Sequence, residues 1–192
     1  MTRLPQLSDD QVGPPELVAA IKKRRGGALV ELDRLLLHST AVATGWGELM
    51  GRVRGALQVP PLLRELAMCG VAVLTGADYE MHHHAPLYLQ AGASDAQLAA
   101  LRCLRDGAQN DPVFDADQRA VLALVVEMTS HVTVHDATFA AARKVLGSDQ
   151  SMLEMVTVIA SYNMVARILV AMKLEPEGSA NVIGDPNLSA PQ

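Results

Sequence analysis

The sequence predicts an all-α fold, because apolar residues recur at helical spacing and proline, glycine and capping residues divide the chain into helix-sized segments. Leu62, Leu66, Cys69 and Val73, for example, follow one another at intervals of three or four residues and therefore share one helix face. Only Val132-Thr133-Val134 has the β-branched composition of a strand, and this run is short. With 192 residues, the chain can bury a core without disulfides.

Proline and glycine place the first three predicted helices. After a polar arm, Pro14-Pro15 begins a helix, since proline is tolerated in a first turn, and Gly26-Gly27 ends it. A short leucine-rich helix follows over residues 29–37. Thr40 can cap a third helix that runs toward Leu57.

The next two helices hold most of the chemically interesting residues. Pro60-Pro61 begins the first and Gly76 ends it, and apolar residues surround most of its circumference beyond Glu65, which predicts a core helix. Asp78 can cap the second helix. We expect a kink or break at Pro86, because proline removes one backbone hydrogen bond and clashes with the preceding turn.

Two capping boxes mark the helices that follow. Ser94 with Gln97, and Asp115 with Gln118, place a capping side chain three residues before a glutamine that can return a hydrogen bond. The remaining helices are expected over about 79–90, 94–104 and 115–130, from Thr133 or Asp136 to Gly147, and over 148–173.

The predicted organisation is one helical domain with an extension at each end. Residues 1–28 form an arm and a helix, residues 29–176 form the domain, and residues 177–192 form a flexible tail rich in Pro, Gly, Asn and Ser. The loop at 106–115 allows the domain to be a two-part helical arrangement.

Composition narrows the function classes. The chain has 16 basic and 21 acidic residues and no basic stripe with interleaved aromatics, so we expect no nucleic-acid partner. Its two cysteines form no Cys-x-x-Cys pair, which is typical of a reducing compartment. The N-terminus lacks an apolar signal segment and the apolar stretches are interrupted, so we expect a cytoplasmic protein without a membrane partner.

Glu65, Glu80 and His84 are the candidate catalytic residues. Glu80 and His84 are four residues apart and share one helix face, where a carboxylate can fix the tautomer of an imidazole. Glu65 lies in an otherwise apolar stretch and needs a partner, water or a proton. If Glu65 reaches the same spot from the preceding helix, the three side chains form a proton relay. The alternative is that Glu80 and His84 are an ordinary pair of surface side chains without a catalytic role.

Three consecutive histidines suggest a metal, but helical geometry argues against one. Successive residues are turned by about 100°, so His82, His83 and His84 cannot share an ion. The sequence also lacks His-Glu-x-x-His and an obvious third ligand. We therefore expect neither a metal nor a cofactor.

Three further residues are candidates for substrate binding. Tyr79 can line a pocket beside His83, which lies four residues later on the same helix. Arg167 is a cation on an apolar helix and needs an anionic partner. This partner could be a core carboxylate in a structural ion pair or an anionic substrate.

The segment ELAMCGVAVLTGADYEMHHHAPLYLQAGASDAQLAAL resembles the core of the carboxymuconolactone decarboxylase-like family, which includes alkyl hydroperoxidase D. A glutamate followed fifteen residues later by Tyr-Glu-x-x-x-His carries the resemblance, which extends over roughly residues 29–176. It implies an all-α multi-helix bundle of the alkyl hydroperoxidase D type, a homo-oligomer and a small-molecule substrate.

The peroxidase branch of that family carries Cys-x-x-Cys before the histidine, with an upstream glutamate relaying protons. By this resemblance, Glu65 falls on the relay glutamate and His84 on the histidine, whereas Ala77 and Glu80 replace the two cysteines. A thiolate is the nucleophile that attacks a peroxide, and neither Ala nor Glu can replace it.

Three functional hypotheses follow. The first is a lyase-like acid/base enzyme acting on a small organic acid, lactone or related carbonyl compound through Glu65, Glu80 and His84. The second is a hydroperoxide reductase that uses Cys69, one helical turn after Glu65. The third is a non-catalytic helical oligomer that binds a small ligand or a protein.

Overall fold

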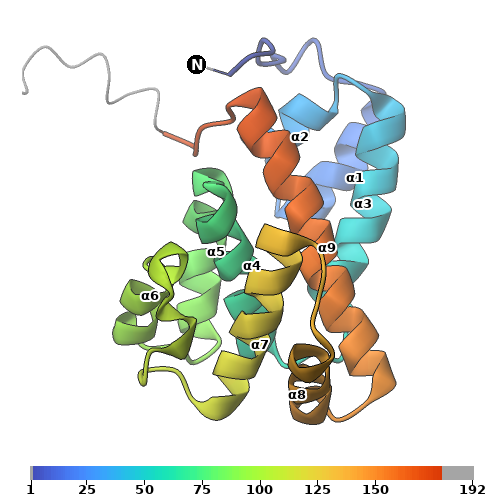
Figure 1. Ribbon diagram of the computed structural model, residues 1–192. Helices are drawn as coiled ribbons and strands as arrows, with labels where there is room; N and C mark the ends of the chain where they lie inside the picture. Colours follow the sequence, from blue (N-terminus) through green and yellow to red (C-terminus); the bar gives the residue numbers. More distant parts are fainter. Residues whose placement is uncertain (1, 179–192) are drawn as a thin grey trace, which may run out of the picture. The chain divides into compact units, whose positions relative to one another are not determined.

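The computed structural model describes residues 2–178, and within this range it contains nine α-helices, three short helical turns and no strand (Figure 1). The prediction of an all-α fold is therefore confirmed. The chain divides into two compact units: one holds the residues up to Gly47 and from Met172 onward, and the other holds Glu48–Ala171. The domain boundaries expected from the sequence stay a prediction, and residues 179–192 of the expected tail lie outside the described residues.

The first unit contains α1 (Pro15–Arg25), α2 (Glu31–Leu36) and the start of α3 (Thr40–Gly55). Gly26 ends α1 in the left-handed conformation, with φ of 85°. Asp33 is buried in α2, and its carboxylate accepts hydrogen bonds from Arg25 Nε and Nη2, both at 3.0 Å. The arm before α1 is held by Arg34, which donates to the Leu7 carbonyl at 2.8 Å. Buried charge in this unit is thus paired.

The second unit is built around α4 (Pro61–Thr75), which packs on α5 (Asp78–Gln90) and α7 (Ala116–Val126). Gly70 makes the α4–α7 contact close, because a Cβ at this position would lie 3.1 Å from Val125 Cγ1. The short α6 (Asp95–Leu101) packs against α5, and α8 (Asp136–Leu146) packs against α7. The long α9 (Asp149–Met172) supplies a further set of buried side chains to this unit.

Local capping signals were predicted well where the side chain itself makes the cap. Both capping boxes are present: Ser94 Oγ accepts from the Gln97 amide at 3.2 Å, and Asp115 Oδ1 accepts from the Gln118 amide at 2.8 Å. The cap expected from Asp78 is wrong, since Ala77 is the N-cap residue of α5 and makes no side-chain cap.

Four other local expectations need correction. Thr40 is the first residue of α3, and Ser39 Oγ accepts a hydrogen bond from the Val42 amide instead. At Pro86, where a kink or break was expected, no break occurs and α5 continues through the residue. Residues 127–131 form a π-helical turn after α7, and Val132 has a φ of 66°, which is incompatible with the strand considered there.

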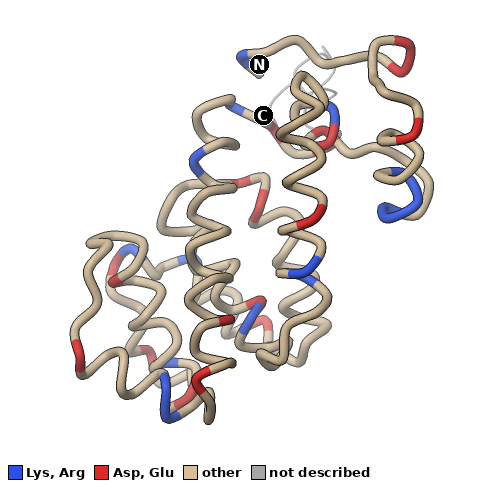
Figure 2. The backbone as a smooth tube through the Cα atoms, turned by 90° about the vertical axis from the view of Figure 1, so that its right-hand side faces the viewer, with Lys and Arg blue, Asp and Glu red and all other residues tan. Residues whose placement is uncertain are grey.

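Charge and hydropathy fit this architecture. Figure 2 shows Lys, Arg, Asp and Glu scattered along the tube, with long uncharged stretches between them. By length and composition, α9 is the one described helix that is apolar enough to cross a membrane, with a mean hydropathy of 1.7 over its most apolar stretch. Core helices of soluble proteins have the same property, and 50% of that stretch is buried.

Candidate active site

Glu65 and His84 form a buried carboxylate–imidazole pair between two consecutive helices. Gly76, with a φ of 72°, ends α4 and lets the chain turn into α5, which packs along α4. The turn brings Glu65 Oε2 to 2.8 Å from His84 Nδ1. Their residues are only 5% and 8% exposed, so water contributes little to their solvation. A carboxylate at Nδ1 favours the tautomer that carries its proton there.

The other ring nitrogen of His84 meets Tyr162 on α9. Tyr162 Oη lies 2.9 Å from His84 Nε2, and the two rings pack edge to face. Burial raises the pKa of Tyr162 to about 12, while the charge of Arg54 opposes this shift. The phenol therefore stays protonated at neutral pH and can donate to Nε2. In this arrangement His84 Nδ1 donates to Glu65 and His84 Nε2 accepts from Tyr162, so each of the two hydrogen bonds has one donor and one acceptor.

A guanidinium lies at each end of this chain of hydrogen bonds. Arg54 on α3 donates from Nε to the Tyr162 oxygen at 3.3 Å. Arg64 on α4 donates from Nε and Nη2 to Glu65 Oε1, both at 3.4 Å. The sequence of contacts is thus Arg54, Tyr162, His84, Glu65 and Arg64.

Glu80 is buried but stands apart from this chain. It is 3% exposed, and neither of its carboxyl oxygens has a hydrogen-bond partner among residues 2–178. Burial raises the pKa of Glu80 well above its ordinary value, and the charge of Arg54 opposes the shift only in part. Burial therefore favours the protonated, neutral form of Glu80. The structure shows no hydrogen bond between Glu80 and His84, whose ring nitrogens contact Glu65 and Tyr162 instead.

A cavity of about 320 Å³ opens beside the pair. Its charged or ionisable lining residues are Arg54, Arg64, Glu65 and His84. The rest of its lining consists of Pro61, Leu87, Gln90 and Ala91. A small molecule in this cavity would therefore meet the carboxylate–imidazole pair directly.

The structure does not bring the three predicted substrate-binding residues to this cavity. The rings of Tyr79 and His83 contact each other at a tilt of 51°, with centroids 4.6 Å apart, and neither residue lines the cavity. Arg167 donates to the carbonyl and side-chain oxygens of Asn163 at 2.8 and 2.9 Å. It forms no ion pair with any described residue, so the nearby amide takes the place of the carboxylate partner considered from the sequence.

Sequence reasoning missed Arg54, Arg64 and Tyr162 as site residues. For Arg64, the only available signal in the sequence was that it directly precedes the candidate residue Glu65. Tyr162 lies 78 residues from its partner His84 and 108 residues from its partner Arg54. A buried tyrosine in an apolar helix needs a hydrogen-bond partner, but spacing cannot say which one.

Cys69 is completely buried on α4, one turn after Glu65, whereas Cys103 is exposed. Burial raises the pKa of the Cys69 thiol far above its ordinary range, with the nearby Glu65 and Glu80 adding to the shift. The thiolate form is therefore strongly disfavoured. Among residues 2–178, no group of three His, Cys, Asp or Glu side chains is arranged to hold a metal ion.

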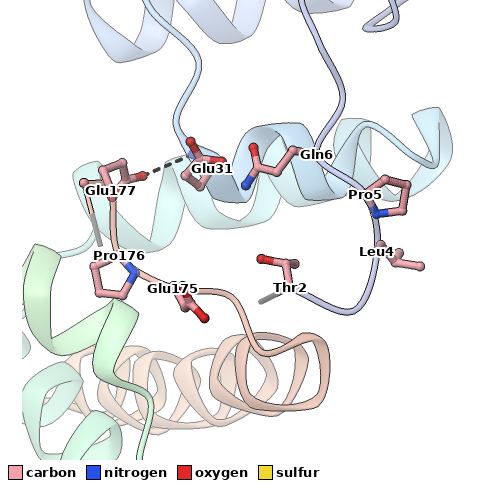
Figure 3. Close-up of a pocket in the computed structure, with 9 residues that line it drawn as sticks. Thr2, Leu4, Pro5, Gln6, Glu31, Glu175, Pro176 and Glu177 are labelled. Carbon is pink, nitrogen blue, oxygen red and sulfur yellow. Dashed lines mark hydrogen bonds between the residues drawn. The ribbon is translucent and has the colours of Figure 1, made fainter. Parts of the chain in front are cut away.

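A second cavity, of about 360 Å³, lies in the other unit (Figure 3). It is lined by residues of the N-terminal arm, by Glu31 and by residues 175–178. Glu31 donates its backbone amide to Glu177 Oε1 at 3.1 Å, the contact that Figure 3 marks with a dashed line. None of the predicted site residues lines this cavity.

The fold and the site together define an all-helical protein with a buried carboxylate–imidazole pair beside a cavity of about 320 Å³. Residues 37–114 match the model of the Carboxymuconolactone decarboxylase family, and this match confirms the resemblance found in the sequence. The matched segment includes Arg54, Glu65 and His84, whereas Tyr162 lies beyond it.

Two solved structures show the same fold. One is an uncharacterized peroxidase-related protein from Silicibacter sp. TM1040, with 17% identity, a TM-score of 0.73 and coverage of 92% of this chain and 94% of that chain. The other is the alkylhydroperoxidase AhpD core of an uncharacterized peroxidase-related protein from Ralstonia eutropha JMP134. Its identity is 14%, its TM-score 0.75, and the match covers 92% of this chain and 93% of that chain. At such identities the likeness shows the fold alone. No curated protein gave a significant match.

Proposed function

We propose that this protein is a lyase-type acid/base enzyme that acts on a small organic acid, lactone or related carbonyl compound. Glu65 and His84 are its reacting pair. The observation that carries the proposal is the 2.8 Å contact between Glu65 and His84 in the wall of a cavity large enough for a small organic molecule. A hydrogen-bonded carboxylate–imidazole pair can take up and return a proton at neutral pH.

The geometry favours Glu65 as the group through which the pair meets the substrate. Both ring nitrogens of His84 are already engaged, by Glu65 and by Tyr162. Glu65 Oε1 is held only by two long contacts of 3.4 Å from Arg64. A proton taken from a carbon next to a carbonyl can move to Glu65 Oε1. His84 and Tyr162 can then respond to the changed charge of Glu65 through their hydrogen bonds. The sequence had suggested the reverse order, with Glu65 in support of His84.

Glu80 has a different role in this proposal from the one expected from the sequence. It was expected to act as a general base or acid beside His84. Because burial favours the neutral form of Glu80 and this residue does not line the cavity, we assign it to the buried interior near the pair and not to the reacting groups. A neutral carboxyl there avoids a second negative charge close to Glu65.

The hydroperoxide reductase alternative has less support. The two similar structures carry peroxidase-related descriptions, but Ala77 and Glu80 stand where the resemblance places the redox cysteines. Cys69 is buried and its thiolate is disfavoured, so it lacks the properties of a peroxide-attacking thiol.

The non-catalytic alternative rests on the good pairing within the site. Glu65, His84 and Tyr162 do satisfy one another, as side chains with a purely structural role would. The cavity beside them favours an enzyme, since a structural cluster needs no opening. A homo-oligomeric state and a cytoplasmic location remain proposals based on the sequence and its resemblance.

Proton exchange on candidate substrates tests the proposal. A panel of small keto acids, lactones and simple carboxylic acids is incubated with the protein in D₂O, and NMR measures deuterium entry next to the carbonyl and release of CO₂. We expect exchange or decarboxylation of at least one compound, with a bell-shaped pH–rate profile. Glu65→Gln and His84→Ala should each lower the rate by about 100-fold or more.

His82→Ala is the matched control, because His82 is exposed on the same helix and lies outside the cavity lining. It should keep the wild-type rate. Circular dichroism verifies that every variant is folded. Wild-type rates in folded Glu65→Gln and His84→Ala would contradict the proposal, as would an inactive wild-type protein across the whole panel.

A further inference from the structure

Two guanidinium groups in the cavity wall have hydrogen-bond donors to spare. Arg54 uses only Nε, toward Tyr162, and its two terminal nitrogens have no partner among the described residues. Arg64 makes two contacts of 3.4 Å to a single oxygen of Glu65, and its Nη1 makes none within residues 2–178. Both arginines line the same cavity. A guanidinium offers five N–H donors, so most of the donors here await an acceptor.

The charges around the cavity do not balance without a ligand. Arg54 and Arg64 contribute two positive charges, and Glu65 is the one acidic residue in the lining. Glu80, the nearby second carboxyl, does not line the cavity, and burial favours its neutral form. The cavity wall therefore carries net positive charge and attracts an anion.

The remaining lining residues indicate which chemical groups the rest of a ligand would contact. Pro61, Leu87 and Ala91 present apolar surface, and Gln90 adds one amide. Leu87 is 42% exposed, so its side chain presents apolar surface that the carbon chain of a ligand can contact. The wall thus combines two anion-binding groups with a patch that suits a short carbon skeleton.

We propose that Arg54 and Arg64 together bind the carboxylate of a small aliphatic organic acid in this cavity. This inference rests on the proposed function and narrows its substrate class: the substrate is a carboxylate anion, and a neutral lactone or carbonyl compound is a poor ligand. The planar fork of a guanidinium matches the two oxygens of a carboxylate. The substrate-binding role considered for Arg167 thereby passes to two residues that the cavity brings together.

Carboxylate binding has a direct consequence for the acid/base pair. Arg64 is the residue that holds Glu65 Oε1, and its contacts are long. A substrate carboxylate competes with Glu65 for Arg64, and its binding frees Oε1 to accept a proton from the substrate. Arg54 is meanwhile the partner of Tyr162, so both ends of the hydrogen-bonded chain respond to the same ligand.

Calorimetric titration of the full-length protein tests the site with three probes. Pentanoate carries a carboxylate and a short chain, pentanamide has the same shape without charge, and inorganic phosphate is an anion without the chain. We expect pentanoate to bind at least about tenfold more tightly than either of the others. Raising the salt concentration should weaken pentanoate binding.

Four variants assign the binding to the two arginines. Arg54→Gln and Arg64→Gln should each raise the Kd for pentanoate about tenfold or more, and Arg54→Lys and Arg64→Lys should recover part of the loss. Arg102→Gln is the matched control, because Arg102 lines a different cavity together with Gly76 and Asp78. It should bind pentanoate like the wild type. Circular dichroism establishes that each variant is folded.

The outcomes separate this inference from the proposed function. Equal binding of pentanoate and pentanamide, or wild-type Kd values in the folded Gln variants, would overturn the carboxylate site. Phosphate binding as tight as that of pentanoate would reduce it to a general anion site and overturn the assignment. Arginine-dependent pentanoate binding in a protein that exchanges no protons on any substrate would instead leave the carboxylate site standing and remove the acid/base function.

Discussion

Both carboxyl oxygens of Glu80 lie in the interior without a hydrogen-bond partner among the described residues. Helical spacing predicted that Glu80 shares a face with His84, and this spacing holds, but sharing a face does not compel contact. His84 instead bonds Glu65 on one side and Tyr162 on the other. Burial without a partner raises the pKa of Glu80 and so favours its protonated form.

Replacement of Glu80 by glutamine should change how stability depends on pH. The native pKa of Glu80 is raised, so the native state binds more protons than the unfolded state once the pH exceeds the ordinary glutamate value of 4.5. Stability of the wild type should therefore fall as pH rises through this region toward the raised pKa. Glu80→Gln removes that loss and should be more stable at pH 8 by on the order of 1–3 kcal/mol.

Urea denaturation at pH 5 and pH 8 measures this effect, with exposed Glu48 as the control position. Glu48→Gln should keep the wild-type dependence on pH. An unchanged pH dependence in Glu80→Gln would mean that Glu80 is ionised and paired in the native protein, contrary to its surroundings here.

At the scale of single elements, α5 shows how tertiary packing overrides a local signal. Pro86 lies nine residues into the helix, yet α5 runs unbroken from Asp78 to Gln90. His84 and Tyr88 are buried on either side of Pro86, so packing holds the helix together where proline opposes it. The loss of one backbone bond at His82 remains, because Pro86 has no N–H to donate to that carbonyl.

Pro86→Ala should therefore stabilise the protein, because it restores a backbone hydrogen bond and relieves the clash within a helix that already exists. Pro86 is exposed, so the substitution removes little packing. We expect a gain of about 1–3 kcal/mol, seen as a higher Tm in calorimetry. His82→Ala, also exposed on α5, should change stability by less than about 0.5 kcal/mol. A lower Tm for Pro86→Ala would show that the native backbone depends on proline there.

Element boundaries were predictable where one side chain decides them. The two capping boxes and the glycines at the ends of α1, α4 and α8 are local signals, and each was found from the sequence. The π-helical turn at 127–131 was missed. It follows α7 with no residue that marks it, and Glu127 then accepts bonds from His135 and Thr138 at the start of α8.

At the scale of the whole molecule, the site gathers residues from four helices: α3, α4, α5 and α9. Glu65 and His84 could be brought together by sequence reasoning, because their helices are consecutive and a tight turn joins them. Arg54 and Tyr162 come from distant parts of the chain, so no spacing rule connects them. Arg167 was considered for substrate binding because an isolated charge needs a partner. Asn163, one helical turn earlier, accepts its hydrogen bond instead.

The shared fold does not determine which reaction the protein catalyses, because the chemistry depends on the side chains at the cavity. Two proteins of 17% and 14% identity share this fold over more than nine-tenths of the chain. Most side chains therefore differ while the helices keep their arrangement, and function has to be argued from the residues at the cavity.

The central claim is that His84 is held between Glu65 and Tyr162 as one chain of hydrogen bonds. Nitrogen-15 NMR of the His84 imidazole, at a pH where the ring is neutral, tests it most directly. The geometry predicts a proton fixed on Nδ1 and an unprotonated Nε2 that accepts from Tyr162, with the Nε2 resonance shifting in Tyr162→Phe. A ring that carries its proton on Nε2, or that averages freely between both tautomers, would contradict the account.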